Sequence, residues 1–133
     1  MTGPQQRQGR RLTSGSIDFS FNGTRYKARA GDTVAAALIA NGVRLIGRSV
    51  KARRRRGILS AGPEEPNALL TVVCGRELIP NVAATQLIVT EGLEARSQNT
   101  CPSPDFDLAS VLQLGGGVFS AGFYYKTFFW PSW

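Results

Sequence analysis

The opening of the chain constrains the fold most strongly, because it predicts a tight antiparallel hairpin. Ile17, Phe19 and Phe21 alternate with polar residues, which is the period of a strand with one buried face. The Asn-Gly pair at 22–23 then supplies two residues that tolerate positive φ in a two-residue turn, and residues 24–29 return as the second strand. Any fold proposed for this chain must therefore begin with these two paired strands.

A short helix is predicted directly after the hairpin. Asp32 or Thr33 can accept the free amide hydrogens at the start of a helix over residues 34–40. Ala37 and Leu38 fall on one apolar face with the first residue of that helix, and an Asn-Gly pair follows as a C-terminal stop. A hairpin with a helix packed across it is the start of a β-grasp fold.

The remaining segments predict an α+β domain with a mixed sheet of four or five strands. Residues 47–66 are rich in Arg, Gly and Pro and lack periodicity, so we expect a long loop there. We expect strands at 69–73, at 78–83 after a turn, and at 86–90. Beyond residue 99, closely spaced prolines cannot continue a sheet.

These patterns predict one domain with two appendages. Residues 1–15 are basic, rich in glutamine and poor in apolar side chains, so we expect a disordered tail. Residues 16–98 form the predicted domain, and residues 99–133 an irregular aromatic extension that links or docks. An apolar content of 42% in 133 residues suffices for one core.

Composition also narrows the compartment and the chemistry. No stretch approaches the roughly 20 apolar residues of a membrane helix, and no secretory signal is visible, so we expect a cytoplasmic protein without a membrane contact. Two cysteines do not make a disulfide framework, which agrees with a reducing compartment. The chain contains no histidine to serve as a general base.

Several short motifs of polar and aromatic residues occur along the chain in a characteristic order. They are found at Gly31–Val43, Gly47–Lys51, Glu64–Leu69, Pro80–Gln86, Glu94–Asn99 and Gly122–Pro131. This set resembles the N-terminal ferredoxin-like domain of the alpha subunit of heterotetrameric sarcosine oxidase, over nearly all of the chain from Ile17 to Trp130. The resemblance implies a ferredoxin-like β-grasp domain and a parent complex that oxidises a secondary amine with FAD and FMN, with NAD as a further possible cofactor.

The same resemblance places an iron–sulfur loop in a segment without cysteines. Where a plant-type ferredoxin has thiolates at C-x4-C-x2-C spacing, this chain has Ser60, Glu65 and Ala68. The fourth ligand position should lie near Ala84 or Thr85. The two cysteines, at 74 and 101, fall on none of these positions. We therefore expect degenerate cluster positions and no cofactor in this chain.

A basic segment, Lys51 followed by Arg53, Arg54, Arg55 and Arg56, accounts for much of the formal charge of +7. Three interpretations remain open: a nucleic-acid patch, a docking site for an acidic or phosphate-bearing surface of a partner subunit, and a solvated loop. The absence of interleaved aromatic residues disfavours nucleic acid. We favour docking.

The adjacent carboxylates Glu64 and Glu65 have no histidine partner, so an ion pair with the arginine segment or a partner is favoured over catalysis. Ser60 and Thr85 lack a base for the same reason, and no catalytic residue is assigned.

The last fifteen residues hold eight large aromatic rings, more than a small core can absorb. We predict partner docking through Phe123, Tyr124, Tyr125, Phe128, Phe129 and Trp130. The alternative is that these rings fold back on the domain's own sheet.

The sequence thus predicts a non-catalytic structural or docking module of a sarcosine-oxidase-like flavin-dependent amine oxidoreductase, with its iron–sulfur site lost. Its expected partners are flavoprotein subunits or downstream domains of an amine oxidase. The alternatives are a protein that binds nucleic acid or an acidic partner through the arginine segment, and a 2Fe-2S electron-transfer subunit.

Overall fold

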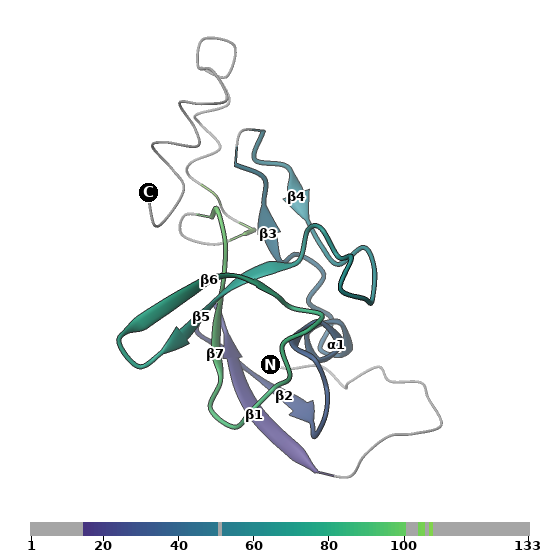
Figure 1. The fold of residues 1–133 in the computed structure, drawn as a ribbon, viewed down its shortest axis with the longest axis vertical. Helices are drawn as coiled ribbons and strands as arrows, with labels where there is room; N and C mark the ends of the chain where they lie inside the picture. The colour runs from purple at the N-terminus through teal and green to yellow at the C-terminus, as the bar shows by residue number, and fades with distance from the viewer. Residues whose placement is uncertain (1–14, 51, 101–103, 106, 108–133) are drawn as a thin grey trace.

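The computed structural model describes residues 15–50, 52–100, 104–105 and 107, and within them a five-stranded sheet, a separate two-stranded sheet and one helix (Figure 1). The elements are β1 (Ser16–Phe21), β2 (Thr24–Arg29), α1 (Val34–Ala40), β3 (Gly47–Arg48), β4 (Arg55–Arg56), β5 (Leu69–Cys74), β6 (Glu77–Ala83) and β7 (Glu94–Ser97). The order in the large sheet is β2-β1-β7-β5-β6.

The predicted opening hairpin is confirmed. β1 and β2 pair antiparallel, with Phe19 opposite Tyr26. Asn22 and Gly23 form the turn with φ of 52° and 78°, the left-handed conformation that this residue pair tolerates. The alternation of side chains leaves Phe19 and Phe21 buried on the face that carries the core.

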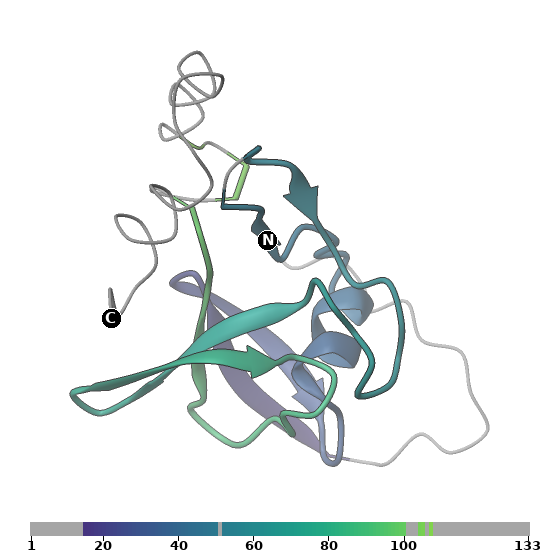
Figure 2. The ribbon, with the colours of Figure 1, turned by 45° about the horizontal axis from the view of Figure 1, so that its top comes forward.

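The predicted helix is also confirmed, and its caps follow from the sequence. The Thr33 side chain accepts a hydrogen bond from the Ala36 amide at 3.2 Å, and Gly42 adopts a φ of 79° just beyond the last turn. The apolar face, including Ala37 and Leu38, is fully buried. Figure 2 shows α1 lying against one face of the five-stranded sheet.

The middle of the sheet was not predicted. β7 lies between β1, to which it runs parallel, and β5, to which it runs antiparallel. The strand expected at 86–90 is wrong, because Ile88 makes only an isolated bridge to Thr33. β7 was missed because Glu94 and Arg96 pair with each other at the surface, and only the fully buried Ala95 marks the apolar face.

The segment at 47–66 is more ordered than the long loop that we expected. Gly47–Arg48 and Arg55–Arg56 pair antiparallel as β3 and β4, with Arg48 opposite Arg55. This small sheet, the arginine hairpin, stands apart from the five-stranded sheet in Figure 1. Gly57, directly after β4, lies close to the backbone of Arg44. A Cβ at this position would lie 2.5 Å from the Arg44 carbonyl oxygen, so a larger residue would not fit without a shift.

The core lies between α1 and the large sheet. Its largest fully buried side chains are those of Phe19, Val34, Leu38, Ile46 and Leu70. The mixed sheet with one packed helix confirms the α+β, ferredoxin-like fold class. The predicted tail, the aromatic extension and the domain boundaries lie largely outside the described residues and stay predictions. In the part of the chain that the structure describes, no helix is long and apolar enough to cross a bilayer.

Leu38→Ala should lower the free energy of unfolding by about 2–5 kcal/mol, because the side chain is fully buried against the sheet. Ile39→Ala is the matched control on the same helix, since Ile39 is 52% exposed, and it should cost much less. Urea unfolding of both variants measures the difference. A cost for Leu38→Ala below about 1 kcal/mol would contradict the packing described here.

Candidate functional site: a loop closed by Glu65 and a basic hairpin

The loop from Gly57 to Ala68 is organised around one buried carboxylate. Glu65 is 4% exposed, and its Oε2 accepts hydrogen bonds from the amides of Leu59, at 2.7 Å, and of Ser60. Its Oε1 accepts from the amides of Asn67, at 2.8 Å, and of Ala68, at 3.2 Å. A single side chain thus satisfies four backbone donors that the irregular loop would otherwise bury without partners.

The surroundings of Glu65 favour its ionised form. Burial by itself raises the pKa of this carboxyl. The hydrogen bonds from the four backbone amides lower the pKa by more than burial raises it, so the net pKa lies below the ordinary value of 4.5. We expected Glu65 to pair with the arginine segment or a partner; instead, its bonds are to backbone amides. Its neighbour Glu64 is exposed.

The four predicted cluster positions come together around this loop. Ser60 and Ala68 contact Glu65 through their amides, and Thr85 donates its hydroxyl hydrogen to the Gly62 carbonyl at 2.9 Å. The Ser60 hydroxyl is buried and has no hydrogen-bond partner among the described residues. The structure thus brings the four positions to one loop and shows that Glu65 is bonded to the loop itself; their assignment as former cluster positions stays a prediction.

The residue types at these positions do not fit a two-iron cluster. Such clusters are held by cysteine thiolates, whereas the loop offers a hydroxyl, a carboxylate and a methyl group, with a second hydroxyl at Thr85. Among the described residues, no group of three or more His, Cys, Asp or Glu lies close enough to hold a metal ion. Cys74 is an exposed free thiol at the end of β5.

The arginine hairpin is held by an internal ion pair. Arg53 is 6% exposed and binds Asp107 through two parallel hydrogen bonds, Nε to Oδ2 at 2.8 Å and Nη2 to Oδ1 at 2.6 Å. Arg48 lies 3.8 Å from the same carboxylate and donates to the carbonyls of Arg53 and Pro104. We predicted that Arg53 docks a partner. Because its guanidinium is buried and bonded to Asp107, Arg53 is not exposed for such a contact.

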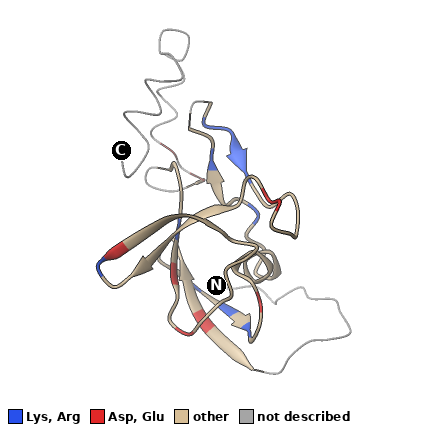
Figure 3. Ribbon diagram, in the orientation of Figure 1, with Lys and Arg blue, Asp and Glu red and all other residues tan. Residues whose placement is uncertain are grey.

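The three arginines that follow are exposed, and β4 stands out as basic in Figure 3. Arg55 pairs with Asp105 at 3.1 Å, but both side chains are mostly exposed, so the pair contributes little stability. Arg56 donates to Asn67 Oδ1 at 3.0 Å and joins the hairpin to the Glu65 loop. Arg54 has no side-chain hydrogen bond or ion pair with any other described residue.

Sequence reasoning missed the role of Asp107, to which it assigned no part in the site. Its distance of 54 residues from Arg53 leaves no local signal, and only the excess of arginines suggested that some would need buried partners. Lys51 and the docking aromatics, Phe123, Tyr124, Tyr125, Phe128, Phe129 and Trp130, lie outside the described residues, so their docking role stays a prediction.

Comparison with known proteins gives a consistent result. The profile of the family described as "2Fe-2S iron-sulfur cluster binding domain" matches residues 14–100. Sarcosine oxidase subunit alpha of Rhizobium meliloti is 52% identical over 116 residues, which are 87% of this chain and 12% of that protein. The subunit from Corynebacterium sp. strain U-96 is 45% identical over 83 residues, 60% of this chain and 9% of that protein. The chain therefore spans about a tenth of these relatives.

A crystal structure of L-proline dehydrogenase from P. horikoshii is similar in fold, with a TM-score of 0.55 and 23% identity over 74% of this chain and 18% of that chain. Together these matches confirm the resemblance to sarcosine oxidase alpha subunits. They contradict our expectation that the chain has no cofactor, because the matched family is one that binds a 2Fe-2S cluster. Family membership therefore indicates a 2Fe-2S cluster, whereas the residue types of the loop do not supply its thiolate ligands.

Glu65→Gln should destabilise the protein by about 1–3 kcal/mol, because the amide cannot accept four backbone hydrogen bonds as strongly as a carboxylate does. Glu64→Gln, a change of the exposed neighbour, is the matched control and should be nearly neutral. Denaturant unfolding measures both, and hydrogen exchange at residues 59–68 should speed up only in the Glu65 variant. Equal effects of the two substitutions would contradict the role of Glu65.

The same carboxylate predicts a pH dependence of stability. Because the pKa of Glu65 is lower in the folded state than its ordinary 4.5, its stabilisation is fully present above 4.5 and is lost as the pH falls through the folded value. The difference in unfolding free energy between the unmodified chain and Glu65→Gln should therefore shrink between neutral pH and about pH 3. A difference that stays constant over this range would show that Glu65 is not charged in the folded protein.

Proposed function

Because this chain belongs to the family of 2Fe-2S iron-sulfur cluster binding domains, we propose that it is a structural and docking module of a flavin-dependent amine oxidoreductase related to sarcosine oxidase. The family and the relatives support association with an oxidoreductase. The observation that supports the finer proposal is the Glu65 loop, in which a carboxylate binds the backbone amides of the segment where we expect the family's cluster loop.

We assign no electron-transfer step to this loop. The hydroxyl, carboxylate and methyl groups at Ser60, Glu65 and Ala68 do not supply the thiolate ligands that such a cluster requires. The module therefore contributes structure: a rigid sheet, a loop with its amides satisfied, and an exposed basic edge. We assign it no catalytic residue.

The proposed partners are the flavoprotein subunits, or the downstream domains, of an amine oxidase that binds FAD and FMN. This proposal is supported by two features. Both curated relatives described above are alpha subunits of sarcosine oxidase, and this chain matches only a small part of each. The aromatic segment within 99–133 and the exposed arginines of the hairpin offer the docking groups. We place this assembly in the cytoplasm, in keeping with the two cysteines and their lack of a disulfide framework.

Two alternatives make different predictions about the purified chain. A 2Fe-2S electron-transfer subunit would contain two iron atoms and two acid-labile sulfides per chain, with visible absorbance. A nucleic-acid-binding protein would shift labelled RNA or DNA in a manner that depends on salt and on the hairpin arginines. Metal analysis and a mobility-shift assay separate both from the docking module.

The docking prediction is tested with the tagged full chain, purified from its host. Phe128→Ser with Trp130→Ser should abolish recovery of flavin-containing subunits, because aromatic side chains dominate interface energetics. The matched control replaces Leu78 and Ile79, each 45% exposed on β6, with Ser and should leave recovery unchanged. Recovery is measured by flavin absorbance and mass spectrometry. If the aromatic variant unfolds, as judged by circular dichroism, these rings belong to the core and the docking role fails.

A further inference from the structure

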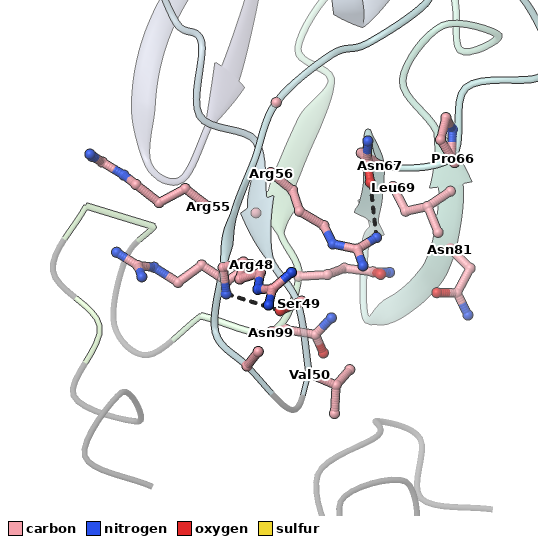
Figure 4. Close-up of a pocket in the computed structure, with 15 residues that line it drawn as sticks. Arg48, Ser49, Val50, Arg55, Arg56, Pro66, Asn67, Leu69, Asn81 and Asn99 are labelled. Carbon is pink, nitrogen blue, oxygen red and sulfur yellow. Dashed lines mark hydrogen bonds between the residues drawn. The ribbon is translucent and has the colours of Figure 1, made fainter. Parts of the chain in front are cut away.

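A hollow of about 630 Å³ lies beside the arginine hairpin, and we call it the arginine pocket. Its walls come from β3 and β4, from the end of the Glu65 loop, and from residues of β6 and of the segment after β7 (Figure 4). Its volume falls in the range of sites that take drug-sized or nucleotide-sized ligands, and it is much larger than a single carboxylate would fill. It is partly open to solvent, so a ligand can enter without a change in the backbone.

The wall of the arginine pocket is suited to an anion. Among the described residues that line it, every ionisable side chain is an arginine and none is a carboxylate. The other polar side chains are mostly carboxamides, from Asn67, Asn81, Gln98 and Asn99. Guanidinium groups match phosphate and carboxylate oxygens with two parallel donors, and carboxamides add neutral donors between them.

The exposed arginines of this hairpin differ in their partners. Arg54 directly precedes β4 and Arg56 is its second residue, and both line the pocket. In Figure 4 the Arg55 guanidinium is directed away from Arg56 and Asn67, and its partner is Asp105. Neither Arg54 nor Arg56 has a carboxylate partner among the described residues. These two charges remain uncompensated beside the pocket.

The neighbouring carboxamides are positioned to act as donors. Asn67 accepts from Arg56 through Oδ1, so its Nδ2 group is left to donate to another acceptor. Asn81 and Asn99, which both line the pocket, hold positive φ of 61° and 56°, a conformation that asparagine tolerates.

We propose that the arginine pocket binds a small phosphate-bearing molecule of the size of a nucleoside diphosphate, with Arg54 and Arg56 holding the phosphates. Two forked cations two residues apart on one hairpin suit two linked phosphate groups, and the remaining volume accommodates the organic part of the ligand. Arg55 also lines the pocket, but it pairs with Asp105. Binding of a small molecule is measured on the chain alone, without a partner subunit, so this site and the docking function proposed above are tested separately.

Isothermal titration of the full chain with ADP tests this site, with adenosine and citrate as comparison ligands. ADP should bind at one site per chain, adenosine should not bind, and citrate should bind at least about tenfold more weakly. Arg54→Gln and Arg56→Gln should each weaken ADP binding by about tenfold or more, because each removes charge-assisted hydrogen bonds to phosphate. Arg55→Gln removes the same charge from the same hairpin, but because Arg55 already pairs with Asp105, it should change the affinity less than about twofold.

The Arg54 side chain makes no hydrogen bond or ion pair with the described residues. Arg54→Gln should therefore unfold at the same temperature as the unmodified chain, which separates a loss of ADP binding from a loss of folding. Absence of saturable ADP binding overturns the proposal. Equal losses in the Arg54, Arg55 and Arg56 variants also overturn it, because they indicate diffuse charge attraction. Citrate binding as tight as that of ADP would overturn the assignment to phosphate, and tighter binding of a single-stranded oligonucleotide would assign the surface to nucleic acid.

Discussion

The functional face of this domain depends on the carboxylate of Glu65. The loop between β4 and β5 makes no regular backbone ladder, so its amides need other acceptors, and one buried side chain provides them at four positions. The same loop is tied to the far side of the fold through the Thr85–Gly62 contact and to the hairpin through Arg56 and Asn67. A carboxylate that satisfies four donors is charged and hydrogen-bonded, which makes its burial favourable despite the cost of desolvation.

The hairpin resolves a similar problem for positive charge. A run of neighbouring arginines would repel itself, and part of that repulsion is removed by burying Arg53 against Asp107, with Arg48 close to the same carboxylate. The three arginines that follow, in β4 and directly before it, remain exposed. The charged segment is therefore neither a uniform patch nor a disordered loop: one arginine maintains the hairpin, while those beside the pocket remain available to a ligand.

Family membership and local chemistry disagree at the loop. The match to a cluster-binding family overturned the expectation of no cofactor, yet Ser60, Glu65, Ala68 and Thr85 stand where we expected the thiolate ligands. The scaffold explains how this is compatible with folding, because the β-grasp sheet and helix place the loop, and the amides of the loop can be satisfied by a carboxylate. A fold can thus keep the geometry of a site while its residues support different chemistry.

The sequence by itself determined the opening hairpin, α1 and its caps, and the β5–β6 pair, because each depends on local turn chemistry and periodicity. It also showed that the chain has no histidine to act as a general base. Only the tertiary structure decided that β7 occupies the middle of the sheet, since a four-residue strand with two charged side chains has too weak a pattern to be recognised. Only the tertiary structure decided that Arg53 and Asp107 pair and that Glu65 binds amides rather than arginine, because these contacts depend on which buried groups the folded chain leaves without other partners.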